Sequence, residues 1–320
     1  MTHGRAVREL CTLLQRIHDV ASPVELFRGF VTACHLALDD IPAHLHDALT
    51  RESIAAPDSR ARWDQAMGRF PPATIEAFAH GFAVLLEACR FLPPDQSYDS
   101  AGGPDVIGSV YMDLLTGRSN RWNYTAQYFT PRTVASAMAQ MSGAGELEAR
   151  FHAEVKRLLA DDPVLQAITV TATIAGADGF WWWLSKAWPR IKPRTEPVTV
   201  CDPCVGSGIL LLAHAACHPR WLAQIGYVQY VGCDIDPLCC AMARLNLRLY
   251  GITPLRLEPV TLEALASLQE TAGPWARAYK TVLTAPPTEQ ETVRVAVVEQ
   301  INRHRREQLS LFEEEDLTCL

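Results

Sequence analysis

From residue 197 onward the sequence alternates between strand-like and helix-like segments, and this alternation constrains the fold more than any other feature. The segment "PVTVCDPCVGSG" predicts a strand that ends in a glycine-rich turn, and "ILLLAHAAC" predicts the helix that follows it. "YVQYVGCDIDP" and "LCCAMARLNLRLYG" repeat this pattern, while "PLRLEPVTL" and "YKTVLTAPP" predict a third and a fourth strand. A long helix is expected from about residue 289. Strands that alternate with helices predict a parallel, doubly wound α/β sheet.

The sequence before residue 95 predicts helices. Apolar residues recur at helical spacing in "VRELCTLLQRIHDV", "PVELFRGFVTACHLALDD" and "TIEAFAHGFAVLLEACRFL". After a polar linker, "DVIGSVYMDLL" predicts another helix, and a further helix is expected to begin at Pro131 with Thr130 as its N-cap. We therefore expect an N-terminal helical domain at residues 1–98, an α/β domain at residues 105–300 and a flexible tail at residues 301–320.

Within the α/β domain, residues 143–195 are expected to form a helical insertion. "ELEARFHAEVKRLLADD" is helical by its pattern, whereas "ITVTATIAGADGFWWWLSKAW" mixes β-branched with aromatic residues and fits a strand, a helix or both. The run Trp181–Trp183 favours packing in a core or an interface over a ligand-binding role.

The composition is that of a globular protein, with 320 residues, 48% hydrophobic residues and a formal net charge of −7. No run approaches the ~20 apolar residues that span a bilayer, and the N-terminus lacks the apolar core of a signal peptide. We therefore expect no membrane association and a cytoplasmic location. Basic clusters occur in "KAWPRIKPR" and "NRHRR", but solvated helix ends have the same composition, so charge alone does not indicate nucleic-acid binding.

The ten cysteines lie mostly inside apolar runs, which is typical of reduced, buried thiols. One spacing could form a zinc site, in which the ligands would be Cys201, Cys204, His214, Cys217 and His218. However, the two leading cysteines bracket a predicted strand end, and a zinc site would need a ligand-bearing knuckle there instead. We therefore favour the glycine-rich turn and expect no metal.

The predicted turn and the second strand place polar groups where ligands bind, because an open α/β sheet binds ligands at the carboxyl ends of its strands. In "DPCVGSG" the glycines allow the backbone to approach a ligand closely, and the next helix offers free N–H groups to an acidic moiety. Asp234, at the end of the second predicted strand, lies where a carboxylate accepts ribose hydroxyls from a nucleoside.

These motifs together resemble the N6-adenine DNA methyltransferases, and in particular the modification subunits of type I restriction-modification systems. "AQYFTPRTVASAM" is similar to the motif in which an aromatic-Thr-Pro loop packs against S-adenosylmethionine (SAM), and "DPCVGSG" resembles the first SAM-binding motif. "GCDIDPLCCAMARLNLRLYGI" resembles the second-strand acid with its helix, and "DVIGSVYMDLL" is also family-like. The resemblance covers about residues 105–141 and 197–288 and implies a Rossmann-like SAM-dependent methyltransferase fold with a truncated parallel sheet. It implies that SAM is bound by Phe129, Thr130, Pro131, Asp202, Gly206, Gly208, Asp234 and Ile235.

The chain departs from this family at the catalytic loop, Ala285-Pro286-Pro287-Thr288. Family members have Asn or Asp, then Pro-Pro, then an aromatic residue. The first side chain accepts a hydrogen bond from the amino group of the flipped adenine, and the aromatic ring stacks on the base. Ala285 has no acceptor and Thr288 has no ring, so the resemblance predicts impaired catalysis. Glu289 or Thr284 could replace the acceptor, although neither occupies its position.

Two more features differ from the family. The sequence stops at residue 320, before the family's further strands, so a missing sheet edge or a partner chain that completes the fold is expected. The stretch before "DPCVGSG" is also longer than usual and could cover an open edge.

The tail carries a motif of its own. "QLSLF" resembles the short motif by which bacterial proteins dock on the replicative sliding clamp, with Leu311 and Phe312 as apolar anchors and Gln308 and Leu309 beside them. The alternative is a helix end whose Leu and Phe side chains fold back on the core.

Three functional interpretations follow. The first is a SAM-binding but catalytically impaired N6-adenine methyltransferase-like protein that associates with DNA or docks on the clamp. The second is an active methyltransferase or modification subunit that requires a partner chain. The third is an interaction module that binds no nucleoside.

Overall fold

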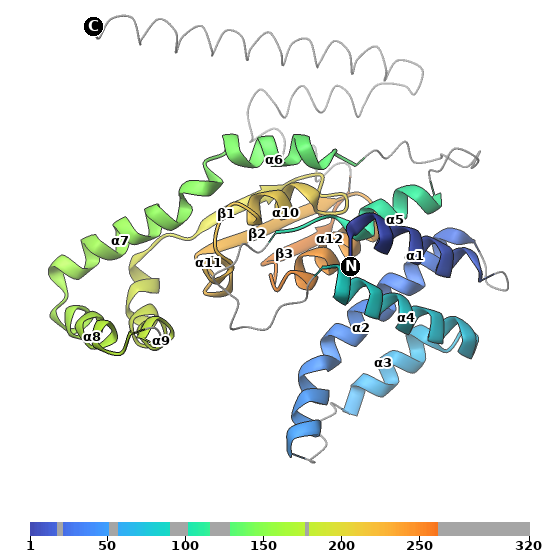
Figure 1. Cartoon of the computed structure of the whole chain (residues 1–320), viewed down its shortest axis with the longest axis horizontal. Helices are drawn as coiled ribbons and strands as arrows, with labels where there is room; N and C mark the ends of the chain where they lie inside the picture. Colours follow the sequence, from blue (N-terminus) through green and yellow to red (C-terminus); the bar gives the residue numbers. More distant parts are fainter. Residues whose placement is uncertain (18–21, 51–56, 90–101, 116–128, 177–178, 262–320) are drawn as a thin grey trace, which may run out of the picture. The chain divides into compact units, whose positions relative to one another are not determined.

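The computed structural model describes residues 1–17, 22–50, 57–89, 102–115, 129–176 and 179–261 (Figure 1). By its internal contacts the chain divides into two compact units, residues 1–259 and 260–320, and the description below concerns the first. The predicted fourth strand, the helix from residue 289 and the tail lie outside the described residues. In the described part of the chain, every helix is too short or too polar to cross a bilayer.

Helices dominate the N-terminal part, as predicted. α1 (His3–Gln15) is amphipathic and packs against α4 (Pro72–Ala88), and α2 (Pro23–Thr50) follows α1 along the chain. α2 continues ten residues beyond the predicted segment, which ended at Asp40. α3 (Pro57–Met67) was not predicted, because its polar sequence "PDSRARWDQAM" shows no clear apolar period.

The start of the helix after the "YFTPR" segment differs from the prediction. α6 runs over Arg132–Met141, and its N-cap is Pro131 instead of Thr130. Pro131 is extended, with ψ of 141°, so it cannot be the first helical residue; its carbonyl oxygen accepts a hydrogen bond from the Ala135 N–H at 3.0 Å. No side chain caps this helix.

The region of mixed pattern is helical throughout its described part. It contains η2 (Ala144–Glu146), α7 (Leu147–Asp161), α8 (Pro163–Ile174), α9 (Gly179–Ile191) and η4 (Lys192–Arg194). Asp162 fixes the start of α8, because its Oδ1 accepts from the Leu165 N–H at 3.0 Å and Pro163 occupies the first helical position. α8 and α9 pack against each other as a hairpin. Local capping therefore overrode the β-branched composition of "ITVTATI".

The sheet has three parallel strands in the order β1-β2-β3: β1 (Val198–Asp202), β2 (Val228–Asp234) and β3 (Arg256–Pro259). This order is that of one half of a doubly wound sheet. The sheet confirms the first three predicted strands and gives a mixed α/β fold, consistent with a methyltransferase-like architecture.

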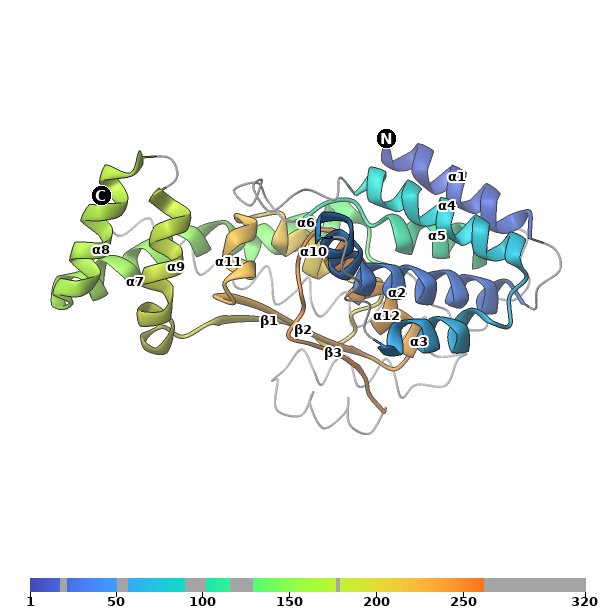
Figure 2. The ribbon, with the colours of Figure 1, turned by 90° about the horizontal axis from the view of Figure 1, so that it is seen from below.

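Within the described residues, three helices cover one face of this sheet (Figure 2): α10 (Ile209–Ala215), α11 (Arg220–Gln224) and α12 (Pro237–Leu249). Thr199 and Cys201 point to the other face and are exposed. The apolar runs predicted that the cysteines are mostly buried, and this is wrong for Cys201. Side chains alternate between the two faces of a strand, and the face that carries Cys201 is uncovered in the described part.

The hydrophobic core is continuous from the N-terminal helices to the sheet. α12 packs against α2 and α5 (Val106–Leu115) as well as against β2 and β3. Polar contacts reinforce this packing: Arg248 of α12 pairs with Asp39 of α2 at 2.7 Å, and His35 Nε2 lies 2.9 Å from the Ala241 carbonyl oxygen. The N-terminal helices therefore support α12 from the side opposite the sheet. The predicted boundary at residue 98 stays a prediction.

Candidate functional site

The carboxyl end of β1 leads into a turn that only glycine accommodates at two positions. Gly206 and Gly208 have φ values of 50° and 87°, in the left-handed region that side chains disfavour. A Cβ atom on Gly206 would also lie 3.1 Å from the ring of Phe129, and one on Gly208 would lie 3.1 Å from the Cα atom of Ala243. The backbone of the turn is therefore packed closely against Phe129 on one side and Ala243 of α12 on the other.

Asp234 holds this turn in place from the end of β2. Its Oδ2 accepts a hydrogen bond from the Gly206 N–H at 2.9 Å, and its Oδ1 accepts from the Asp236 N–H at 3.0 Å. The side chain is buried, with 9% of its surface exposed. Each carboxylate oxygen can accept a second hydrogen bond, so Asp234 retains capacity for a ligand hydroxyl.

Asp202 is the group whose bonding is least complete. Its Oδ1 accepts from the Cys204 N–H at 3.0 Å, but its Oδ2 is buried and has no hydrogen-bond partner among the described residues. Burial raises the pKa of Asp202 to about 6, and the nearby charge of Asp234 acts in the same direction. A buried acceptor without a partner costs about 1–3 kcal/mol. A cationic or N–H donor from a ligand would remove that penalty.

The aromatic-Thr-Pro segment lies against the same turn. Phe129 is partly buried, packs on Gly206 and contacts the ring of Tyr111 in α5, with ring centroids 5.4 Å apart. Thr130 is half-buried and Pro131 is exposed. The structure therefore brings together two segments that are about 70 residues apart in the sequence, as the motif resemblance implied for Phe129 and Gly206.

Ile235 follows Asp234 and is 47% exposed at the end of β2. The next residue, Asp236, caps α12 by accepting from the Leu238 N–H at 2.9 Å. An apolar side chain is thus presented between a buried carboxylate and a helix start, which suits contact with the flat face of a base.

Asp105 is a residue at the centre of the site that the sequence did not indicate. The side chain is buried. Its Oδ1 accepts from the Gly108 N–H at 2.7 Å and from Asn246 Nδ2 at 2.8 Å. Its Oδ2 accepts from the Ser207 hydroxyl. Asn246 also donates to the Ser207 carbonyl oxygen at 2.8 Å. Burial raises the pKa of Asp105, while these hydrogen bonds lower it. Asp105 therefore ties the start of α5 to α12 and to the glycine turn.

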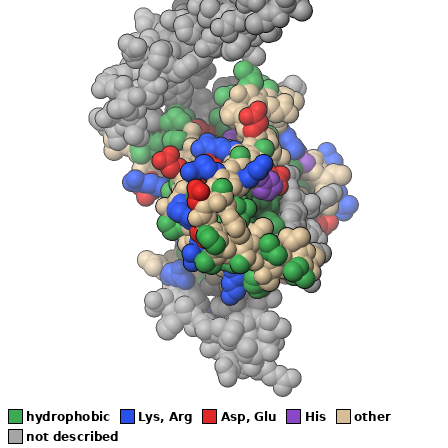
Figure 3. All heavy atoms as spheres, turned by 90° about the vertical axis from the view of Figure 1, so that its left-hand side faces the viewer, with side chains coloured by type: hydrophobic (Ala, Val, Ile, Leu, Met, Phe, Trp, Pro, Cys, Tyr) green, Lys and Arg blue, Asp and Glu red, His purple; other side chains and the backbone are tan. Residues whose placement is uncertain are grey.

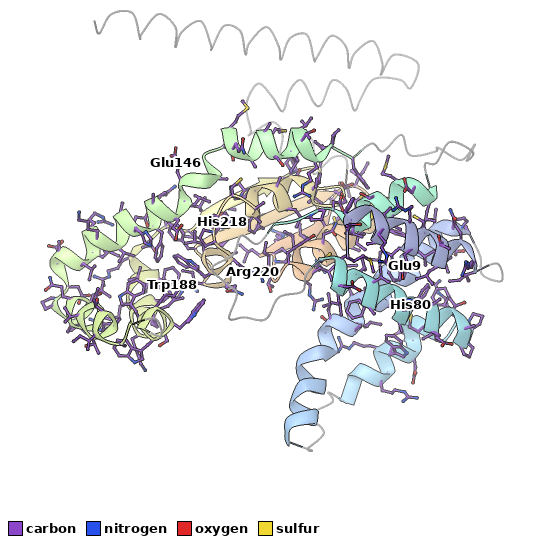
Figure 4. All side chains as sticks on the ribbon, viewed as in Figure 1. Glu9, His80, Glu146, Trp188, His218 and Arg220 are labelled. Atoms are coloured by element: carbon purple, nitrogen blue, oxygen red, sulfur yellow. The ribbon has the colours of Figure 1, made fainter. Side chains whose placement is uncertain are left out.

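The residues of the hypothetical zinc site are arranged around a tyrosine. His218 Nδ1 lies 3.0 Å from the Pro219 carbonyl oxygen, so this nitrogen carries the hydrogen and His218 Nε2 accepts from the Tyr230 hydroxyl at 2.7 Å. The single hydroxyl hydrogen is then used, so His214 Nδ1 donates to the Tyr230 oxygen at 3.2 Å. Figure 4 marks His218 on the segment between α10 and β2. Among the described residues, no group of three or more His, Cys, Asp or Glu side chains is placed to bind a metal.

This network predicts a loss of stability in acid. Burial, with the charge of His218 as a second cause, lowers the pKa of His214 to about 4. Between pH 6.5 and 4 the unfolded chain binds a proton that the folded chain excludes, so the free energy of unfolding falls as the pH falls. The loss at pH 5 is about 2 kcal/mol for this residue.

Urea unfolding at pH 7 and pH 5 tests the prediction. The His214→Gln variant should lose less stability than the wild type between these two values. The matched control is His80→Gln, because His80 is exposed and lies outside the Tyr230 network. His80 Nε2 of α4 is 3.6 Å from Glu9 Oε1 of α1 (Figure 4). An identical pH dependence in the wild type and His214→Gln would contradict the prediction.

Two predicted sites fall outside the described residues. These are the catalytic loop, Ala285, Pro286, Pro287 and Thr288, and the clamp motif, Gln308, Leu309, Leu311 and Phe312.

Comparison with known proteins links this part of the chain to methyltransferases. Residues 186–316 match the model of the family described as N-6 DNA methylase. A stretch of 69 residues, 21% of the chain, is 39% identical to the 23S rRNA (guanine(2535)-N(1))-methyltransferase of Streptomyces viridochromogenes. The matched stretch spans about a quarter of that relative's length (26%). No solved structure matches the chain.

These matches support the methyltransferase family and indicate a DNA methyltransferase-like function for this part of the chain. Members of that family generally use SAM as the methyl donor.

Proposed function

We propose that this protein binds SAM and is an N6-adenine DNA methyltransferase-like protein with impaired catalysis, which associates with DNA or docks on a sliding clamp. The observation that carries the SAM assignment is the buried Oδ2 of Asp202, which has no hydrogen-bond partner among the described residues and lies beside the turn that Asp234 bonds through the Gly206 N–H. SAM offers a primary ammonium group, ribose hydroxyls and an adenine ring. The residues of the site therefore fit these groups of SAM. Asp202 would accept from the ammonium group, Asp234 would accept from the ribose hydroxyls, and Ile235 and Phe129 would make apolar contact.

The Asp202→Asn variant tests this assignment. Removing the negative charge should weaken SAM binding about 10- to 100-fold, because hydrogen bonds to charged groups contribute about 1.5–3 kcal/mol. Isothermal titration calorimetry measures the affinity. The matched ligand is 5′-methylthioadenosine, which lacks the amino-acid part of SAM and should bind the wild type and the variant equally.

An equal loss for both ligands would mean that Asp202 supports the fold and does not contact the ammonium group. No binding of SAM to the wild type would favour an interaction module without a nucleoside site.

The impaired catalysis rests on the sequence of the catalytic loop. An acceptor at position 285 and a ring at position 288 are the two groups that would orient and bind a flipped adenine, and neither Ala285 nor Thr288 provides one. The alternative is an active methyltransferase or modification subunit that obtains these groups from a partner chain. Methyl transfer that appears on adding a partner, and that Asp234→Ala abolishes, would favour this alternative.

Clamp docking rests on the motif "QLSLF". A pull-down with purified bacterial sliding clamp tests it, with the double variant Leu311→Ala plus Phe312→Ala as the comparison. Equal recovery of the wild type and the variant would remove clamp docking from the proposal.

A further inference from the structure

The α8–α9 hairpin carries an unusual share of the exposed apolar side chains. Among the described residues, eleven large hydrophobic side chains are exposed, and five of them lie on these two helices. The five are Val164, Val170, Ile174, Trp181 and Trp182. Exposed apolar groups that gather in one place are typical of a binding surface.

The two faces of α9 differ in character. Trp183 is buried, and its Nε1 donates to the Thr169 hydroxyl at 2.9 Å, so this indole serves the packing of the hairpin. Trp181 and Trp182 are 37% and 38% exposed. At 100° per residue, Lys186 lies one turn beyond Trp182 on the same outward face. The outward face of α9 therefore combines indole rings with a cation.

The segment that carries these rings is basic. From Gly179 to Thr195 the sequence contains Lys186, Arg190, Lys192 and Arg194 and no carboxylate. Asp162, at the start of α8, pairs with Arg194 at 2.7 Å and lies 3.7 Å from Arg190, so it offsets part of this charge. Neither lysine forms an ion pair with any described residue. Figure 3 looks onto this end of the molecule, where Lys and Arg side chains lie beside apolar ones.

We propose that the outward face of α9, with Trp181, Trp182 and Lys186, together with Lys192 of η4, binds single-stranded nucleic acid. Indole rings stack on unpaired bases whatever their sequence, and cations neutralise the phosphates between them. A protein partner would use the uncharged outward face of α8 instead, but Lys186 and Lys192, which form no ion pair with a described residue, favour a polyanion. This surface does not include the residues proposed to bind SAM, so the two proposals can fail independently.

Fluorescence anisotropy with a labelled single-stranded DNA of about 16 nucleotides tests the proposal on the full chain. The double variant Trp181→Ala plus Trp182→Ala should bind at least tenfold more weakly. Trp181→Phe plus Trp182→Phe, which keeps a ring at both positions, should recover most of the affinity. Lys186→Gln plus Lys192→Gln should weaken binding and reduce the slope of log K against log salt by about 1.4, at about 0.7 per phosphate.

The matched control lies on the other helix of the same hairpin. Val164→Ala plus Ile174→Ala removes exposed apolar side chains from α8 without touching the proposed surface, and should leave DNA affinity unchanged. Near-ultraviolet circular dichroism and Tm of each variant report whether the fold is retained.

Three outcomes would overturn the proposal: no binding by the wild type, equal affinity in the wild type and a folded Trp double variant, or an equal loss in the α8 variant. If sedimentation instead shows that the wild type self-associates and that the α8 variant does not, the hairpin is a protein interface. The SAM titration described above is a separate readout, so a chain that binds DNA without binding SAM would contradict only the proposed function.

Discussion

Replacing Ala285 with Asn and Thr288 with Tyr is expected to raise methyl transfer to DNA by about 10²-fold or more. One preorganised polar group at a reacting centre contributes about 10²–10³ in rate, and a stacking ring adds about 1–3 kcal/mol of base binding. The Asn side chain would accept the hydrogen bond from the adenine amino group, and the Tyr ring would stack on the base. The measurement is transfer of labelled methyl groups from SAM to adenine-containing DNA.

The single variants and a third substitution make this test specific. Ala285→Asn alone should give most of the gain in rate, and Thr288→Tyr alone should act mainly on DNA affinity. Adding Asp202→Asn to the double variant should remove the gain, because the methyl donor would bind weakly.

Robust turnover by the wild type alone would contradict the proposal that catalysis is impaired. A double variant that binds SAM and DNA but stays at the wild-type rate would show that more than these two groups has been lost.

The substitution Asp105→Ala is expected to lower the free energy of unfolding by about 3 kcal/mol or more. It would leave the buried Gly108 N–H and Ser207 hydroxyl without their acceptor and would remove one of the two acceptors of the Asn246 amide. Each buried donor without an acceptor costs about 1–3 kcal/mol. Urea unfolding at pH 7 measures the change. Asp113→Ala, on the helix that Asp105 precedes, is the control, because Asp113 is exposed and should change stability by less than about 0.5 kcal/mol.

Asp105→Asn separates the charge from the hydrogen bonds. Asn retains the Oδ1 acceptor, and the Ser207 hydroxyl can rotate to accept from the new amide, so this variant should lose only about 1 kcal/mol at pH 7. The raised pKa of Asp105 means that the folded chain retains a proton that the unfolded chain releases above pH 3.8. The contribution of this carboxyl to stability therefore falls as the pH rises.

Asp105→Asn removes this pH dependence, so its stability relative to the wild type should improve from pH 4 to pH 7. A loss of less than 1 kcal/mol in Asp105→Ala would show that the network contributes little. A SAM affinity that falls in Asp105→Ala but not in Asp105→Asn would identify Asp105 as a positioning residue for the glycine turn.

The parts of the fold that the sequence predicted well are those specified by local patterns. Period-2 runs closed by glycine or proline gave β1, β2 and β3, and amphipathic repeats gave α1, α7 and α12. The turn at Gly206 and Gly208 was predictable because a left-handed backbone requires glycine. The patterns did not predict α3, and they left α8 undecided, because a polar helix and a Thr-rich helix have no distinctive period.

The structure brings some of the predicted site residues together, but their bonding was not predicted. Phe129, Gly206 and Asp234 do lie together, yet Asp234 bonds the turn backbone itself, and the spacing of residues gave no sign of this. Asp105 was missed as a site residue because it begins the predicted helix "DVIGSVYMDLL", where an acidic residue is ordinary. Only packing beneath α5 and α12 makes it a buried acceptor for groups more than 100 residues away.

By itself, the sequence determined the α/β alternation, the glycine turn, and the presence of Ala285 and Thr288 where the resembled family has an acceptor and a ring. These are local matters of backbone conformation and side-chain chemistry. The tertiary structure alone decided which face of β1 is covered, which of the three adjacent tryptophans is buried, and which carboxylates are buried. Burial depends on what other segments pack against a residue, and that information is not contained in the residue's own neighbours along the chain.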